Sequence, residues 1–128
     1  MHRSYDIGLV ALAVGMRSKW VDNLLSHHEL PGVSRSRQGV QRRITDDGLL
    51  AIELVRMFAA DLDMSVAKAT LLARAALDAR SENGATLRTP SGIALSLDLD
   101  AIERRLTERV VDAVDSVARV PRGRPAKP

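Results

Sequence analysis

The residues of this chain that could do chemistry are charged and hydrogen-bonding side chains gathered near the N-terminus. One set directly follows Gly15 and consists of Arg17, Ser18, Lys19, Trp20, Asp22 and Asn23. On a surface helix, long or bonding side chains of these types can reach base edges in the major groove of DNA. The set predicts recognition of DNA, but taken alone it fits the surface of an ordinary helical hairpin nearly as well. We expect Trp20 to pack between this helix and the basic segment that follows, or to touch the DNA at its edge.

A second basic set lies further along the chain, in a segment too poor in apolar residues to form a core helix. It consists of Arg35, Arg37, Gln38, Arg42 and Arg43. With a glycine in its middle, the segment favours a hairpin with strands near residues 33–36 and 41–44, which we call the basic hairpin. Arginines on a narrow hairpin meet phosphates, or a narrow minor groove. A charged loop alone is more often simply solvated, but its position after the first set favours contact with DNA.

Other reactive groups are missing or lack partners. Without cysteine the chain has no disulfide, no thiolate metal site and no cysteine nucleophile. The adjacent His27 and His28 diverge by about 100° on a helix, and no third ligand has matching spacing. The serines lack His and Asp partners, and paired aspartates such as Asp61 and Asp63 are explained by caps and turns. We therefore expect no enzyme activity, no cofactor and no bound metal.

The elements that must position the two basic sets are mostly helices. Hydrophobic residues make up 45% of the chain but aromatic residues only 2%, a mix that suits an aliphatic, helical core. Residues 7–14 are nearly all apolar, and residues 16–25 place apolar side chains on one face, which predicts two short helices separated at Gly15. A small residue at Ala11 and the glycine at the turn fit a helix-turn-helix.

Further helices and a second hairpin are expected downstream. They are a helix over 46–62 capped by Thr45, a helix over 66–80 capped by Ser65, a hairpin over 86–97, and a last helix capped by Asp100, with Glu103 completing a capping box.

The last helix carries a single apolar stripe, formed by Ile102, Leu106, Val110, Val114 and Val117. Such a stripe packs either onto the core of its own chain or against a second copy. We favour a homodimer, because a single small module buries too little surface on DNA to read a long site tightly.

Charge is distributed unevenly along the 128 residues, whose net charge is +3. Residues 1–45 hold seven Lys/Arg against three acidic residues, residues 46–120 hold nine against thirteen, and residues 121–128 add three basic residues. An acidic middle between two basic ends indicates a polyanionic partner. No apolar run reaches membrane-spanning length and no signal-peptide pattern opens the chain, so we expect a cytoplasmic, nucleoid-associated protein.

The tail from Pro121 is rich in proline, glycine and basic residues, which favours disorder. Its Arg122-Gly123-Arg124-Pro125 segment resembles the core of an AT-hook, in which Arg-Gly-Arg lies along an A·T-rich minor groove. For so short a motif, nonspecific attraction of Arg122 and Arg124 to phosphates is the simpler interpretation.

Four segments of the N-terminal part also carry a family pattern. They are Tyr5-Asp6-Ile7-Gly8 at the entry to the first helix, the turn at Gly15-Met16, the stretch from Gly39 to Thr45 with adjacent Arg42 and Arg43, and Leu62-Asp63-Met64-Ser65-Val66 between two later helices. Over roughly residues 5–78 the chain thus resembles the MerR-like winged helix-turn-helix family. This resemblance implies a regulator that contacts DNA with its second helix and its wing and dimerises through a C-terminal helix.

The sequence as a whole predicts a mainly α fold with three parts. These are a winged helix-turn-helix domain with a small β-hairpin wing over residues 1–82, a second short hairpin with a C-terminal dimerisation helix over 83–120, and a disordered basic tail over 121–128. The expected function is a homodimeric, sequence-specific transcriptional regulator of double-stranded DNA, most simply a repressor. Two alternatives stay open: an antitoxin-like autoregulator that binds a partner protein through its C-terminal half, and an accessory factor that bends DNA in recombination.

Overall fold

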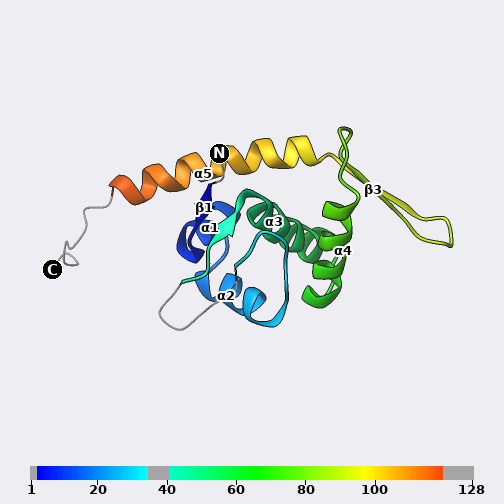
Figure 1. The fold of residues 1–128 in the computed structure, drawn as a ribbon, viewed down its shortest axis with the longest axis horizontal. Helices are drawn as coiled ribbons and strands as arrows, with labels where there is room; N and C mark the ends of the chain where they lie inside the picture. The colour runs from blue at the N-terminus through cyan, green and yellow to red at the C-terminus, as the bar shows by residue number, and fades with distance from the viewer. Residues whose placement is uncertain (1–2, 35–40, 120–128) are drawn as a thin grey trace.

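Figure 1 shows the fold of the chain in a computed structural model, which describes residues 3–34 and 41–119. The helices are α1 (Ile7–Val14), α2 (Ser18–His27), α3 (Asp46–Asp61), α4 (Val66–Asp78) and α5 (Leu99–Arg119). The strands are β1 (Ser4–Tyr5), β2 (Ile44–Thr45), β3 (Ala85–Arg88) and β4 (Ala94–Leu97), in two small antiparallel sheets. The expectation of a mainly helical chain is confirmed.

The break between the first two helices lies at Gly15, as the sequence predicts. Gly15 adopts a left-handed conformation with φ of 72°, which a glycine enters without the clash that a Cβ causes. The Met16 N–H then donates to the Ala11 carbonyl at 3.0 Å, which satisfies an orphan acceptor at the end of α1. α2 begins at Ser18, slightly later than expected, so Arg17 stands at its N-cap in extended backbone.

Side-chain caps begin the next two helices at the predicted residues. The Thr45 hydroxyl accepts the Gly48 N–H at 3.4 Å at the start of α3, and the Ser65 hydroxyl accepts the Lys68 N–H at 3.2 Å at the start of α4. Each cap satisfies one of the backbone donors that a helix start leaves unpaired.

The cap of α5 differs from the prediction. Asp98, and not Asp100, begins this helix, because its carboxylate accepts the Ala101 N–H at 3.0 Å. Asp100 lies inside the first turn, where it still complements the helix dipole. Glu103 therefore completes no capping box; its carboxylate pairs instead with Arg80, beyond the end of α4.

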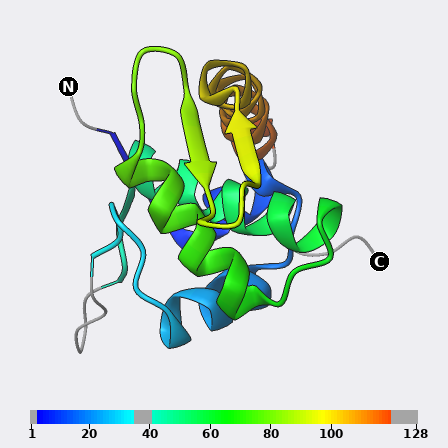
Figure 2. The ribbon, with the colours of Figure 1, turned by 90° about the vertical axis from the view of Figure 1, so that its right-hand side faces the viewer.

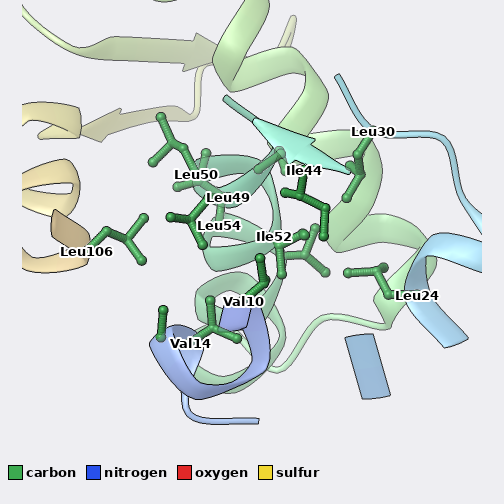
Figure 3. Close-up of a cluster of buried hydrophobic side chains, with 14 of the residues drawn as sticks. Val10, Val14, Leu24, Leu30, Ile44, Leu49, Leu50, Ile52, Leu54 and Leu106 are labelled. Atoms are coloured by element: carbon green, nitrogen blue, oxygen red, sulfur yellow. The ribbon is translucent and has the colours of Figure 1, made fainter. Parts of the chain in front are cut away.

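The hydrophobic core is aliphatic and centres on α3. Ile52, Leu54 and Val55 of that helix are fully shielded from solvent, and α4 packs closely along it. Figure 3 shows how the other elements bring side chains to this centre, among them Val10, Val14, Leu24, Leu30, Ile44 and Leu106. At about 25 cal/mol per Å² of apolar surface removed from water, burial of this cluster is the main term that stabilises the fold.

The first sheet joins the N-terminus to the base of the basic hairpin. β1 pairs with β2 so that Ser4 lies opposite Thr45 and Tyr5 opposite Ile44. Val33 forms a further antiparallel bridge with Ile44, and the Ser34 N–H donates to the Arg43 carbonyl at 3.0 Å. The described base of the basic hairpin is thus antiparallel, while residues 35–40, with Arg35, Arg37 and Gln38, lie outside the described residues.

α5 lies on α1, on the side of the molecule opposite α2 (Figure 1). Ile102, Leu106 and Val110, predicted to face a second copy, are buried in the core of their own chain, which corrects the expectation for these three residues. They pack inward because α1 presents an almost wholly apolar surface to them. Val114 and Val117 stay about half exposed, at 48% and 49%.

Candidate nucleic-acid interface

α2 has one face in the core and one face in solvent. Val21, Leu24 and Leu25 are buried, and they fix the rotation of the helix about its axis. The predicted base-reading residues follow on the other side, and all of them are exposed: Arg17, Ser18, Lys19, Asp22 and Asn23, together with Ser26. The structure therefore brings this predicted set together on one accessible surface, which we call the α2 face.

The polar groups of the α2 face suit hydrogen bonding to a nucleic acid. Arg17 and Lys19 supply positive charge at the start of the helix, where the backbone dipole adds partial positive charge. Ser18 and Asn23 supply neutral donors and acceptors, and Asp22 supplies an acceptor for an exposed base amino group. Arg17 makes no side-chain cap to the helix, which leaves its guanidinium uncommitted to that role.

Trp20 was predicted to pack between α2 and the basic hairpin, whose residues 35–40 lie outside the described residues. It is half-buried against the core, and it shares a small hollow with Asn23, Leu24 and Val66, the first residue of α4. No described residue of the basic hairpin takes part in that hollow. Trp20 thus lies near the start of α4 and keeps part of its surface accessible.

The base of the basic hairpin lies beside the C-terminal end of α2. Arg42 is half-buried and lines a hollow of about 440 Å³ together with Ser34 from the other hairpin strand and with Ser26, His27 and His28 from α2. The hairpin base and the end of α2 thus border one concave surface. Arg122 and Arg124, the predicted contacts of the tail, lie outside the described residues.

Arg43 has a structural partner that the sequence did not reveal. Its guanidinium donates to the Ser4 carbonyl at 3.0 Å and to the Ser4 hydroxyl at 3.1 Å. Arg43 was predicted as a DNA contact, but the structure uses its side chain to hold β1 against the hairpin base. A strand as short as β1 has no detectable periodicity, so nothing in the sequence pointed to Ser4.

Within residues 3–34 and 41–119, no group of three or more His, Cys, Asp or Glu side chains is placed to hold a metal ion. No helix in the same ranges is both long and apolar enough to cross a membrane. Comparisons with protein-family models, with curated proteins and with solved structures found no match for this chain.

Proposed function

We propose that this chain is a sequence-specific DNA-binding regulator of the winged helix-turn-helix type, related in plan to the MerR-like family and acting most simply as a repressor. In this proposal α1 and α2 form the helix-turn-helix, and α2 enters the major groove. The basic hairpin acts as the wing and contacts the neighbouring backbone or minor groove.

The observation that carries the proposal is the division of α2 into two faces. A polar outer side is common to surface helices. On α2 that side also gathers two cations, a hydroxyl and an amide close to the start of the helix, and all of them are accessible. A recognition helix needs this arrangement, because its inner side must be held rigidly while its outer side reaches the bases.

The neighbourhood of α2 supports the same function. The base of the basic hairpin borders the C-terminal end of α2, as a wing must if it is to contact DNA at the same time. Arg43 and Ser4 fix that base to β1 and hence to the core, so the hairpin starts from a rigid point. α5 lies on the opposite side and leaves the α2 face free (Figure 1).

The proposal is tested by removing the two cations of the α2 face. We expect Arg17→Ala with Lys19→Ala to weaken binding to a DNA site selected from a random library by at least about 30-fold, since each base contact is worth about 1–3 kcal/mol. Both residues are exposed, so the melting temperature should stay unchanged. A gel shift at fixed salt measures the affinity.

The matched control is Arg104→Ala with Arg105→Ala, which removes the same charge from exposed positions on α5, away from the α2 face. We expect this variant to keep most of the affinity. If the two double variants bind alike, overall charge and not the α2 face determines binding, and the proposal fails.

A further inference from the structure

The hairpin formed by β3 and β4 extends away from the helical body. Figure 1 shows it projecting beyond the N-terminal end of α5, and Figure 2 shows the two strands side by side next to α4. Of the two strands, β3 is the one that packs on α4. A ribbon of two strands is marginal on its own in water, and packing on a helix or pairing with a further strand stabilises it.

The hydrogen-bond pattern of the hairpin shows which backbone groups of β4 point outward. The Thr89 N–H donates to the Ile93 carbonyl at 2.8 Å at the closed end of the hairpin. Bonded and non-bonded pairs alternate along an antiparallel ladder, so the pair of Leu87 with Leu95 is a bonded one. The N–H and C=O groups of Ala94 and Ser96 therefore point away from β3, toward the free edge of β4.

That free edge has no charge, proline or bulge within the strand, and its one protection is that the strand is only four residues long. Natural edge strands are protected by charged residues, prolines or bulges. β4 reads Ala-Leu-Ser-Leu, without charge or proline, whereas β3 ends at Arg88 and is followed closely by Pro90. The edge of β4 is therefore the one that is chemically open to another strand.

One face of β4 is also apolar and only partly covered. Leu95 and Leu97 of β4 alternate with Ile93, which directly precedes the strand, so the three side chains share a face. Ile93 is 67% exposed, and the two leucines are half-buried. An added strand would cover part of this surface.

We propose that β4 pairs antiparallel with β4 of a second copy of this chain and forms a four-stranded sheet across a two-fold axis. The strand is self-complementary in one register. Ala94 and the partner's Ser96 form the bonded pair with their outward-pointing groups, and Leu95 meets the partner's Leu95 at the axis. Ile93 then lies opposite the partner's Leu97, so the apolar faces of the two copies become continuous.

This inference does not depend on DNA binding, because its readout is the oligomeric state of the free protein. Ser96→Pro removes the outward N–H and leaves the backbone bonds of the hairpin ladder in place. It also removes the contact between the Ser96 and Thr86 hydroxyls, which the Thr86→Pro control below removes equally. We expect it to weaken self-association at least about tenfold, since it deletes an inter-chain hydrogen bond from each copy. Sedimentation equilibrium measures the dissociation constant.

Two control variants locate the interface. Thr86→Pro makes the same change directly opposite, on the outer edge of β3, and should leave the dimer intact. Val114→Lys places a charge on the exposed face of α5 and should also leave it intact. A wild-type chain that is monomeric, or a dimer that Val114→Lys dissolves while Ser96→Pro does not, overturns the proposal.

Cross-linking tests the register directly. Because the chain has no cysteine, Leu95→Cys introduces a single thiol at the two-fold axis. Opposite residues of a non-bonded pair lie about 4.5 Å apart between Cα atoms, which a disulfide can bridge. Ala94→Cys is more exposed, but in this register position 94 lies diagonally across from position 94 of the second copy. The distance between them is about 7–8 Å, which a disulfide bridges poorly.

Under mild oxidation we therefore expect a disulfide-linked dimer for Leu95→Cys and little for Ala94→Cys, resolved on a non-reducing gel. Equal cross-linking of the two variants, or stronger cross-linking of Ala94→Cys, contradicts the proposed register.

Discussion

At Gly32 the turn before the basic hairpin touches the first turn of α3 too closely to admit a side chain. A Cβ added there would lie 2.3 Å from the Gly48 nitrogen and 2.4 Å from the Thr45 hydroxyl. The Gly32 carbonyl accepts the Thr45 N–H at 2.8 Å, which closes the contact from the other side. This approach fixes where the basic hairpin leaves the core, so it positions part of the candidate interface.

We therefore expect Gly32→Ala to destabilise the fold more than Gly15→Ala. The two glycines have similar φ, 78° and 72°, but nothing lies near the Cβ position of Gly15. Gly15→Ala should cost about 1–2 kcal/mol for the left-handed backbone, and Gly32→Ala at least about 1 kcal/mol more for the clash. Urea unfolding measures the free energy of unfolding of both variants. Equal losses would show that the turn at Gly32 shifts to admit a methyl group, and would contradict this prediction.

Tyr5 gives the N-terminal strand a pH-dependent anchor. Its hydroxyl donates to the Asp46 carboxylate at 2.8 Å. Burial, and after it the hydrogen bond to Asp46, raises the pKa of Tyr5 above its usual value. A raised pKa means that the folded state holds the proton more tightly, so this stabilisation is complete below about pH 10 and is lost as the pH rises beyond it.

Tyr5→Phe should remove that alkaline dependence. We expect it to lower the free energy of unfolding by about 1 kcal/mol at neutral pH, through the lost hydrogen bond. Above about pH 10 the variant and the wild type should converge, as the tyrosine of the wild type ionises. Unfolding in urea at a series of pH values checks this, and a constant gap between the two proteins would rule out the role given to Tyr5.

At the scale of elements, a buried ion pair joins α3 to α5. The Glu53 carboxylate is almost fully buried and accepts from Arg56 at 2.7 Å and from Arg109 of α5 at 2.8 Å. The hydrogen bond that Arg56 donates to Glu53 raises the pKa of Arg56. The two arginines keep partial access to water, so the carboxylate is the group that depends on its partners.

This asymmetry predicts unequal mutational costs. Arg56→Ala combined with Arg109→Ala leaves a buried carboxylate without partners and should destabilise the fold by about 3 kcal/mol. Glu53→Gln leaves arginines that can turn toward water, so it should cost less. Chemical denaturation measures the loss of folding stability in both variants. A larger loss for Glu53→Gln would contradict the statement that the carboxylate is the group that depends on its partners.

The sequence predicted the elements well where a local signal defines them. The helices of residues 7–14, 46–61 and 66–78 follow from periodicity, from Gly15 and from the caps at Thr45 and Ser65. Asp98 and Asp100 are both good cap residues, and only the path of the chain out of β4 selects the first.

Tertiary packing decided the rest of the fold and of the candidate site. A single apolar stripe on α5 fits its own core or a second copy equally well, and the apolar surface of α1 settles the matter for Ile102, Leu106 and Val110. The role of Arg43 was likewise predicted from the basic residues near it in the sequence, while its partner Ser4 lies far away along the chain.

The whole molecule presents its possible interaction surfaces in different directions. The α2 face lies on one side, α5 lies on the opposite side, and the β3–β4 hairpin extends from one end (Figures 1 and 2). Two copies joined through β4 would leave both α2 faces free. A two-fold dimer of this kind would favour a palindromic DNA site, because the symmetry of a bound dimer is repeated in its half-sites.

The central claim is that the α2 face reads DNA sequence, and a selection from a random DNA library tests it most directly. The wild-type chain and the Arg17→Ala, Lys19→Ala variant would be carried through the same selection at one salt concentration. We expect the wild type to enrich a defined sequence and the variant to lose that enrichment. Enrichment of no sequence by the wild type, or of the same sequence by both proteins, would contradict the claim.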